Sequence, residues 1–368
     1  MLGLWMASLL LLAPVPVVGT RAPVLNGSKA IRICRPSPPS PSDDDASGSV
    51  PACLVIGDSV SLGYTGSAFG APGSGGNLAH NFRGTCTVLH APFSGDGGAC
   101  DTRYGLQCAD LWLGSTLSGA AAPKYSVIVF NFGLHDTNDK AFDEEARDEF
   151  VPVDEYGRNL VAFAKKIRTH QPQAQLAWLS STPMHFDMHL NSNVRQYNER
   201  ARKLLVAGGV VDAYLDLYTK IVGACGEPPY YASKLAPNVS RICHLINDNE
   251  EYHYNSAGWK LLAAAVGTEI KALLHKGPHS TGAVPEVQAA VVHCPDGKTA
   301  CPSITSSCVA DKFSSTKWGC CMAGPGATSC YDGFHCCAKG SECRANGTNP
   351  VSPLKPMLLN FSHVCVPA

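Results

Sequence analysis

Between residues 52 and 275, short apolar runs alternate with longer stretches in which apolar residues recur every three or four positions. The short runs predict β-strands, which we place at residues 53–56, 87–90, 126–130, 175–179 and 210–217. The longer stretches predict amphipathic helices, which we place at residues 102–113, 154–169, 194–206 and 256–274. Apolar strands that alternate with helices predict a parallel sheet covered on both faces, which is a three-layer α/β/α fold.

The two ends of the chain have a different composition. Residues 20–51 are expected to form a disordered leader, because residues 36–51 are rich in Pro, Ser and Asp and should be extended and solvated. Residues 277–291 predict a polar linker between the α/β domain of residues 52–276 and a module at residues 292–368. That module has ten cysteines and few aliphatic residues, so disulfides rather than an apolar core must hold it, and we expect it to fold separately.

The N-terminus and the cysteine content indicate the secretory pathway. Residues 1–19 contain a leucine run followed by prolines and a small-residue site, which predicts a signal peptide. Seventeen cysteines agree with an oxidising compartment. Glycosylation sequons fall at Asn26, Asn238, Asn346 and Asn360. A formal net charge of −1 and 16% charged residues argue against nucleic-acid binding, and no segment after the signal peptide predicts a membrane helix.

Four blocks of candidate catalytic residues follow the predicted strands. Gly57-Asp58-Ser59 comes directly after the first strand, where a tight turn would present a hydroxyl at the start of a helix. The others are a glycine-rich turn at residues 95–98, Gly133-Leu134-His135-Asp136 after the third strand, and Glu250-x-x-His253 before the last helix. A serine, a distant histidine and an acid together form the set needed for nucleophilic catalysis.

In this order the four blocks resemble the SGNH (GDSL-type) hydrolases, and the resemblance covers about residues 52 to 275. It implies a flavodoxin-like fold, Ser59 as the nucleophile and His253 as the general base. The acid that orients His253 would be Glu250, which stands where the family usually has Asp, and Asp248 is the alternative. No metal or organic cofactor is expected, and we expect His185 and His189 to face substrate from a loop rather than to bind zinc.

The resemblance also implies an oxyanion hole. Its backbone donors would be the N–H groups of Ser59 and of Gly98 or Gly97. His135 stands where the family usually has an oxyanion-binding Asn, and a neutral imidazole can still donate one N–H. The alternative is a structural His135 bonded to Asp136 or to a backbone carbonyl.

The C-terminal cysteines form a second recognisable pattern. Trp318-Gly319-Cys320-Cys321 followed by Asp332-Gly333-Phe334-His335-Cys336-Cys337 resembles the granulin (epithelin) repeat, with Val309 and Ser329 in place of two of its twelve cysteines. The resemblance implies five disulfides, namely Cys294–Cys308, Cys301–Cys320, Cys321–Cys336, Cys330–Cys343 and Cys337–Cys365.

Seven cysteines remain in the N-terminal half, so one thiol should be free. We expect this to be Cys53, buried in the first strand as a small apolar residue. Cys34 and Cys86 receive no partner from the sequence. Local bridges are predicted for Cys100–Cys108 and for Cys225–Cys243, the second of which would brace the loop that carries Glu250 and His253.

These observations favour a secreted serine esterase acting on small acyl esters or on O-acyl groups of carbohydrates. Two alternatives use the same residues differently. The triad could transfer the acyl group to a sugar hydroxyl, which product analysis with and without a polyol acceptor would reveal. Alternatively, the catalytic half could be degenerate, and the chain would then act by binding a glycan or cell-surface partner through its granulin-like module.

Overall fold

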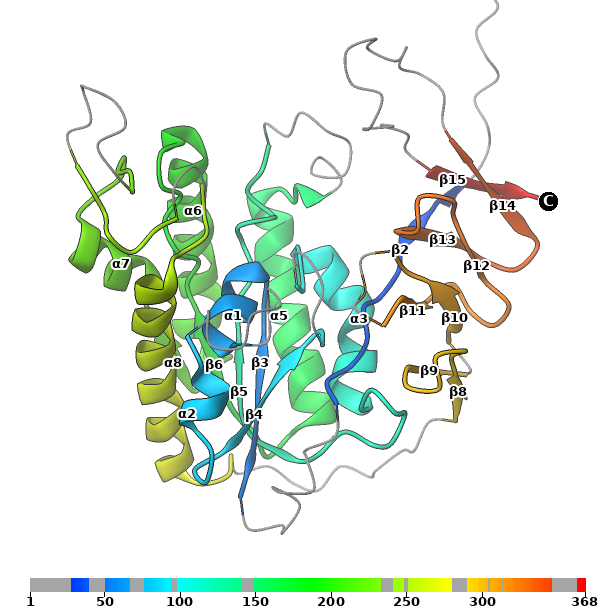
Figure 1. Cartoon of the computed structure of the whole chain (residues 1–368), viewed down its shortest axis with the longest axis horizontal. Helices are drawn as coiled ribbons and strands as arrows, with labels where there is room; N and C mark the ends of the chain where they lie inside the picture. Colours follow the sequence, from blue (N-terminus) through cyan, green and yellow to red (C-terminus); the bar gives the residue numbers. More distant parts are fainter. Residues whose placement is uncertain are drawn as a thin grey trace, which may run out of the picture.

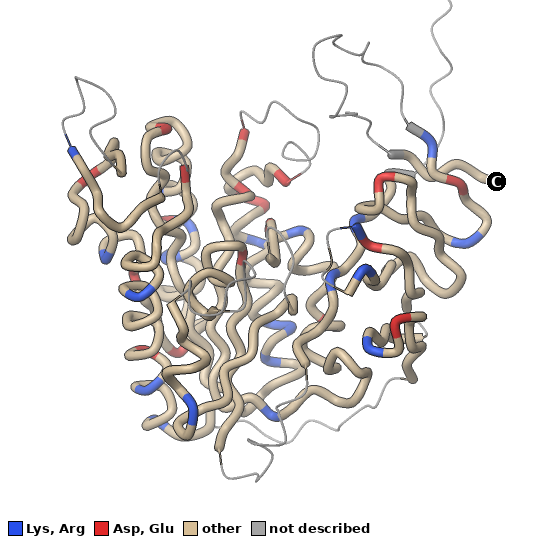
Figure 2. The backbone as a smooth tube through the Cα atoms, viewed as in Figure 1, with Lys and Arg blue, Asp and Glu red and all other residues tan. Residues whose placement is uncertain are grey.

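The computed structural model describes residues 28–39, 50–66, 76–93, 98–139, 149–232, 241–247, 251–279, 290–303, 305–312, 314, 316–345 and 363–368. The predicted signal peptide and the four glycosylation sequons therefore lie outside the described residues. Among the described residues, no helix is both long enough and apolar enough to cross a membrane. Over the same residues, Figure 2 shows Lys and Arg interspersed with Asp and Glu along the backbone.

A five-stranded parallel sheet forms the centre of the larger domain (Figure 1). Its strands, in spatial order, are β4 (Thr87–Ala91), β3 (Ala52–Ile56), β5 (Tyr125–Phe130), β6 (Gln175–Leu179) and β7 (Ala213–Leu215). In chain order this is 2-1-3-4-5, the flavodoxin-like order, so the predicted fold class is confirmed. The fifth strand is shorter than predicted, because Asp216 already caps the helix that follows by accepting from Thr219 N.

Helices cover both faces of the sheet. They are α1 (Ser59–Thr65), α2 (Leu78–Asn81), α3 (Thr102–Gly114), α5 (Val153–His170), α6 (Met188–Ala201), α7 (Leu217–Cys225) and α8 (Ser256–Lys276). A π-helical turn, Arg202–Val206, extends α6. The hydrophobic pattern had not marked α1, α2 or α7, which span nine residues or fewer and therefore too few turns to show a helical period.

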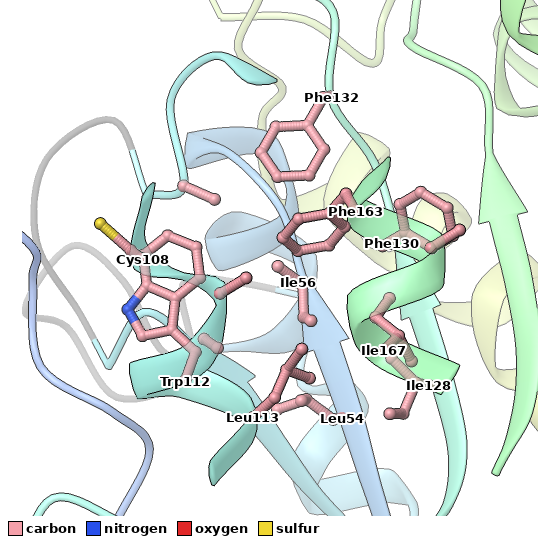
Figure 3. Packing of buried hydrophobic residues seen from close by; sticks show 14 of the residues in the cluster. Leu54, Ile56, Cys108, Trp112, Leu113, Ile128, Phe130, Phe132, Phe163 and Ile167 are labelled. Carbon is pink, nitrogen blue, oxygen red and sulfur yellow. The ribbon is translucent and has the colours of Figure 1, made fainter. Parts of the chain in front are cut away.

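Alternate residues of each strand face opposite layers, as a pleated sheet requires. Leu54 and Ile56 of β3 pack with residues of α3 and α5, including Trp112 and Phe163 (Figure 3). Residues Cys53 and Val55 of the same strand belong to the second apolar cluster, which contains residues of α1, α2 and α8. The sheet is therefore buried on both sides, which explains why its strands read as nearly continuous apolar runs.

The C-terminal module consists of short antiparallel strands. They are β8 (Val291–His293), β9 (Ala300–Pro302), β10 (Ser307–Ala310), β11 (Trp318–Cys321), β12 (Thr328–Ser329), β13 (His335–Cys337), β14 (Ser341–Ala345) and β15 (His363–Pro367). Five disulfides cross-link them with the pairings that the granulin resemblance implies, Cys294–Cys308, Cys301–Cys320, Cys321–Cys336, Cys330–Cys343 and Cys337–Cys365.

Residues 28–39 correct the expectation of a disordered leader. This segment, which we name the strap, includes β1 (Ser28–Lys29) and β2 (Ile31–Arg32), and residues 32–38 are buried. The strap lies between the larger domain and the module, where β2 pairs with β13 and β1 pairs with β15 (Figure 1). Composition suggested a solvated segment, but its arginines and prolines are covered from both sides by folded parts of the chain.

Two predicted cysteine states are wrong. Cys100 and Cys108 do not pair, because Cys100 precedes Asp101, the N-cap of α3, whereas Cys108 lies within the helix and its sulfur is bonded elsewhere. Cys108 instead pairs with Cys34 of the strap, and Cys100 is free and buried. Cys53 is not free, because it pairs with Cys86, which immediately precedes the neighbouring strand β4. The Cys225–Cys243 pair is present as expected.

Helix α1 packs closely against α8 because Gly63 has no side chain. A Cβ atom built at Gly63 would lie 2.6 Å from the indole ring of Trp259, which is itself 6% exposed. Gly258 gives the chain similar room at the start of α8, because a Cβ there would lie 2.3 Å from Leu245 O. These contacts fix the distance between α1 and α8 and between the start of α8 and the segment that precedes it.

The disulfide pattern makes one chemical prediction. Unfolding the protein without reductant and alkylating it should modify Cys100 alone, because the other sixteen cysteines are paired. Peptide mapping by mass spectrometry identifies the modified residue. Alkylation of Cys53, or a Cys100–Cys108 peptide, would contradict the arrangement.

The packing of α1 on α8 predicts an unequal response to two Gly→Ala changes. Gly63→Ala should lower the free energy of unfolding by about 1–3 kcal/mol, because a methyl group has no room against a buried indole. Gly223→Ala within α7 meets nothing within 4 Å and should be neutral or stabilising by up to about 1 kcal/mol. Urea unfolding measures both, and an equal response would contradict the packing account.

Candidate active site

Ser59 is placed by the turn that joins β3 to α1. The strand ends at Ile56, and Asp58 then caps the helix by accepting a 3.0 Å hydrogen bond from Val60 N. Ser59 is the first residue of α1 and is 5% exposed. The position lies at the carboxyl end of β3, whose neighbours β4 and β5 lie on opposite sides of it, so the strand order reverses here. Open α/β sheets bind their ligands at this point.

His253 meets Ser59 although the two residues are 194 positions apart. The distance from His253 Nε2 to Ser59 Oγ is 2.8 Å, so the hydroxyl can donate to the imidazole. The ring of Tyr252 lies edge-on at 4.7 Å from that of His253, and Tyr252 is 42% exposed. A serine hydroxyl held on a histidine nitrogen is the pairing that nucleophilic catalysis requires.

The segment around His253 is braced on several sides. Ile246 and Tyr254 form an antiparallel bridge, and Asn255 caps α8 while donating to His244 O at 2.8 Å. The Cys225–Cys243 disulfide ties the preceding segment to α7. This is the bracing that the sequence suggested for this loop.

The candidate triad acids, Asp248 and Glu250, lie outside the described residues. The carboxylate of the neighbouring Glu251 binds the backbone of another loop. It accepts from Phe186 N at 3.0 Å and from Asp187 N at 2.6 Å. Glu251 therefore joins the 185–187 loop to the His253 segment. The predicted role of Glu250 in orienting His253 stays a prediction.

Gly98 lies directly against the nucleophile turn. A Cβ atom at Gly98 would come within 2.6 Å of Gly57 O and 2.7 Å of the Asp58 carbonyl carbon, and its φ is 57°. The next residue, Ala99, donates its N–H to Gly57 O at 2.8 Å. Only glycine fits such an approach. Gly97, the alternative oxyanion donor, lies outside the described residues.

His135 differs from the expected neutral donor. Its Nδ1 lies 2.7 Å from Glu149 Oε2. Burial alone would lower the pKa of His135, but the charge and hydrogen bond of Glu149, with Asp58 and Asp101 farther away, raise this pKa to about 9. At neutral pH the ring is therefore an imidazolium that donates Nδ1–H to Glu149 and carries a second proton on Nε2. Asp136 is not its partner, because this carboxylate accepts from Thr102 N at 3.0 Å and from Thr102 Oγ1 at 2.6 Å.

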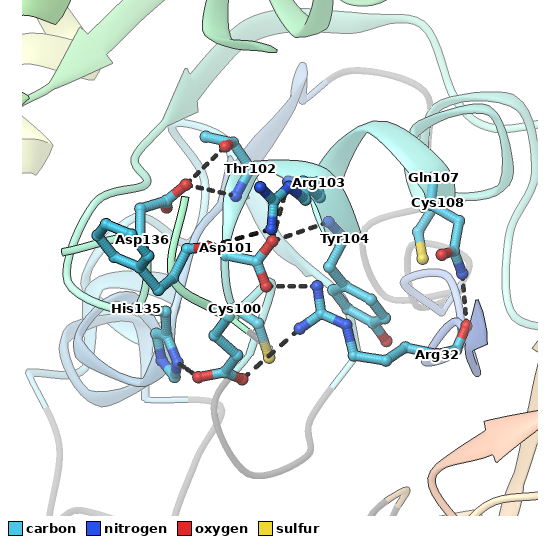
Figure 4. A network of polar contacts seen from close by, with 12 residues as sticks. Arg32, Cys100, Asp101, Thr102, Arg103, Tyr104, Gln107, Cys108, His135 and Asp136 are labelled. Atoms are coloured by element: carbon cyan, nitrogen blue, oxygen red, sulfur yellow. Dashed lines mark hydrogen bonds and ion pairs between the residues drawn. The ribbon is translucent and has the colours of Figure 1, made fainter. Parts of the chain in front are cut away.

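A buried polar network extends from His135 to the strap (Figure 4). Arg32 forms ion pairs with Asp101, the N-cap of α3, and with Glu149 at 3.6 Å. Arg35 donates to Gly98 O at 2.6 Å and to Cys100 Sγ at 3.3 Å. These contacts join the strap to both candidate side-chain and backbone donors of the oxyanion hole.

Cys100, His135 and Glu149 have ligand atoms within 4.8 Å of one another, a spacing that a metal ion could use. Their chemistry does not fit one. Burial raises the pKa of the Cys100 thiol to about 12, so it stays protonated, and a metal needs the thiolate. Arg32 and Arg35 already supply positive charge at this place.

A second serine–histidine pair lies beneath the nucleophile turn. Ser61 Oγ is 2.6 Å from His90 Nε2, and His90 Nδ1 donates to Pro92 O at 2.9 Å. Burial lowers the pKa of His90 to about 4, so the ring is neutral and Nε2 accepts from Ser61. Both residues are at most 3% exposed, and the pair braces the turn rather than serving as a site.

The sequence missed the residues that hold the oxyanion elements. Arg32 and Arg35 were assigned to a disordered leader, and Glu149 lies in a charged segment that showed no pattern. The expected loop at residues 185–189 has a buried end, where the His185 ring contacts those of Tyr230 and Tyr254. His189 lies 2.8 Å from Asp139 instead of sharing a zinc site with His185.

Several solved structures resemble this chain at low identity. One is a catalytic mutant of an acetylxylan esterase from Geobacillus stearothermophilus, with 15% identity, a TM-score of 0.40 and coverage of 60% of this chain and 96% of that chain. Another is a lipase/acylhydrolase from Enterococcus faecalis, with 16% identity, a TM-score of 0.40 and coverage of 61% and 96%. Likenesses at this level identify neither the family nor the reaction of this chain.

The C-terminal module has relatives in sequence. Human progranulin is 37% identical over 62 residues, which are 17% of this chain and 10% of progranulin. Rat (Rattus norvegicus) progranulin is 36% identical over 72 residues, 19% of this chain and 12% of that protein. This chain thus spans about a tenth of the length of these relatives. Residues 307–349 match the family model described as Granulin, and they are therefore a granulin segment within the disulfide-linked module.

Proposed function

We propose that this chain is a secreted serine ester hydrolase of the SGNH type, in which Ser59 is the nucleophile and His253 the general base. The observation that carries the proposal is the 2.8 Å contact between Ser59 Oγ and His253 Nε2 at the carboxyl end of the sheet. Glu250 is the proposed orienting acid and Asp248 the alternative. The proposed substrates are esters of small acyl groups, including O-acyl groups on carbohydrates.

Acylation follows from this pairing. Ser59 Oγ attacks the ester carbonyl carbon while its proton passes to His253 Nε2. The tetrahedral intermediate then collapses, and the alcohol leaves with the proton that His253 returns to it. The products of this half-reaction are the free alcohol and an acyl group bonded to Ser59.

Deacylation repeats the same proton transfers with water. His253 removes a proton from water as it attacks the acyl carbon, and it returns this proton to Ser59 Oγ when the acid leaves. Both tetrahedral intermediates carry a negative oxygen. Its proposed donors are the N–H groups of Ser59 and Gly98 and the Nε2–H of His135.

The protonated state of His135 has a chemical consequence in this proposal. If the ring loses one proton, Glu149 retains the hydrogen on Nδ1, and Nε2 becomes an acceptor. Only the imidazolium can then donate to the oxyanion. The family's usual Asn has no such requirement, so this substitution should make the reaction sensitive to alkaline pH.

Secretion is supported by the cysteine chemistry. Eight disulfides leave one free thiol among seventeen cysteines, which is typical of an oxidising compartment. Residues 1–19 are the proposed signal peptide. The granulin-like module is proposed to bind a glycan or a cell-surface partner.

We expect Ser59→Ala to lower kcat/KM for p-nitrophenyl acetate by about 10³-fold or more without loss of folding, since the nucleophile is removed. Fluorophosphonate should label the wild-type chain and not this variant. Ser61→Ala is the matched control from the same turn: it loses its bond to His90, so stability should fall, but labelling should persist. Labelling that survives Ser59→Ala would contradict the assignment.

The pKa of His135 predicts an alkaline limb in the rate. The wild-type kcat should fall as pH rises through about 9, because His135 then loses the proton on which oxyanion donation depends. In Glu149→Gln the charge that raises this pKa is lost, so the limb should move to lower pH. The profiles are measured after subtraction of non-enzymatic hydrolysis.

His135→Asn is the control for this profile. An amide does not titrate, so the limb should disappear while part of the activity remains. If the alkaline fall in kcat stays at the wild-type pH in both Glu149→Gln and His135→Asn, His135 is a structural residue and the oxyanion is bound by backbone groups alone.

A further inference from the structure

The strap of residues 28–39 contacts the larger domain on one side and the granulin-like module on the other. On the module side, Ile31 and Arg32 pair with Cys336 and His335 of β13. Farther along, Cys34 exchanges 2.9 Å backbone hydrogen bonds with Cys320 in both directions. On the domain side, its sulfur is bonded to Cys108 of α3. The strap is thus an added strand for the module and a covalently attached segment of the domain.

Arg35 of the strap holds the glycine loop. Its Nη1 donates to Gly98 O at 2.6 Å, and Gly98 lies against the nucleophile turn. The arginine is itself fixed at both backbone ends, because its N–H donates to Tyr104 Oη at 2.8 Å and its carbonyl accepts from Trp112 Nε1 at 2.9 Å. The side chain therefore has little freedom, and the residue whose carbonyl it holds, Gly98, carries one proposed oxyanion donor on its own N–H.

Arg32 of the strap acts on the second proposed oxyanion donor, His135, through one intermediate residue, Glu149. It contacts Glu149 at 3.6 Å, and Glu149 contacts His135 Nδ1 at 2.7 Å. Arg32 also pairs with Asp101, and its side chain is 9% exposed. The charges of Glu149, Asp58 and Asp101 all act on His135, so Arg32 balances a locally negative site. Figure 4 shows Arg32, Asp101 and His135 in this network.

We propose that Arg32 and Arg35 are positioning residues for the oxyanion hole and that the granulin-like module acts in catalysis by holding the strap that carries them. This inference rests on the proposed ester hydrolysis. It differs from a partner-binding role, because the module would work on its own chain. Neither arginine touches the reacting atoms, so their removal should act through the placement of Gly98 and His135.

Kinetics of full-length variants test the arginines. Arg35→Ala should lower kcat between about tenfold and a hundredfold with little change in KM, because a displaced donor is felt mainly in the transition state. Arg35→Lys keeps a single donor for Gly98 O and should recover part of the rate. A merely structural role would give no such split between kcat and KM and no graded recovery.

Arg168→Ala is the matched control. Arg168 also donates to a carbonyl, Ala174 O at 2.6 Å, and pairs with a carboxylate, Asp212 at 2.6 Å. Arg168 lies in the last turn of α5, and its partner Ala174 comes just before β6. This is the end of the sheet away from Ser59, so the loss of Arg168 should change stability and leave kcat unchanged. If Arg35→Ala runs at the wild-type kcat while folded, the positioning role is overturned.

A change on the module tests the second half of the proposal. At Gly319 in β11, a Cβ atom would lie 2.5 Å from Ile33 Cγ2 and 2.9 Å from Cys34 O, so Gly319→Ala should push the strap from its place. We expect kcat to fall at least about fivefold with all eight disulfides intact by mass. Gly340→Asn is the control, because that position is open and has a φ of 79°, which Asn tolerates.

Each outcome decides a separate claim. A wild-type chain that neither hydrolyses p-nitrophenyl esters nor reacts with fluorophosphonate overturns the proposed function, and this inference with it. An active wild type with an unaffected, folded Gly319→Ala overturns the role of the module alone. If Gly319→Ala does not fold, Ile33→Ala, which loosens the same contact by removing side-chain bulk, should give the loss of kcat, and full activity would contradict the proposal.

Discussion

A buried guanidinium must be paired, and the pairing of Arg32 determines how the two parts of this molecule meet. Its charge lies between Asp101, which caps α3, and Glu149, which contacts His135. Its backbone belongs to a strand that the module completes. One residue therefore connects the start of a domain helix, a candidate oxyanion donor and the β-structure of the module, and none of these can shift without disturbing the others.

This connection changes how the module should be understood. Its cysteines Cys294, Cys301 and Cys320 belong to the same apolar cluster as Cys34 and Trp112, so it shares a core with the domain. Ala300 N also donates to Leu117 O in the loop that follows α3. The predicted linker at residues 277–291 suggested that the module folds separately, but the module's contacts with the larger domain resemble those inside a single folded core. The module also covers a buried, charged strap that would otherwise be exposed to water.

Periodicity identified the sheet and its long helices, because apolar positions recur within a few residues in both. The blocks that carry Ser59, His253 and His135 were found from short local motifs and their resemblance to the SGNH hydrolases. Neither could find the strap. Arg32 and Arg35 are buried by partners more than sixty positions away, and a segment rich in Pro and Ser gives no local sign of this. Likewise, the pairing of Cys34 with Cys108 spans 74 residues, whereas Cys100–Cys108 looked plausible only because the two are near in sequence.

The most direct test is an experimental structure of the full chain with a fluorophosphonate adduct on Ser59, since the phosphoryl oxygen takes the place of the oxyanion. The account predicts this oxygen within about 3 Å of the backbone nitrogens of Ser59 and Gly98 and of His135 Nε2. It also predicts that Arg35 still holds Gly98 O and that Glu149 still holds His135 Nδ1. An adduct whose oxygen points away from Gly98 and His135, or forms on another residue, would contradict the account.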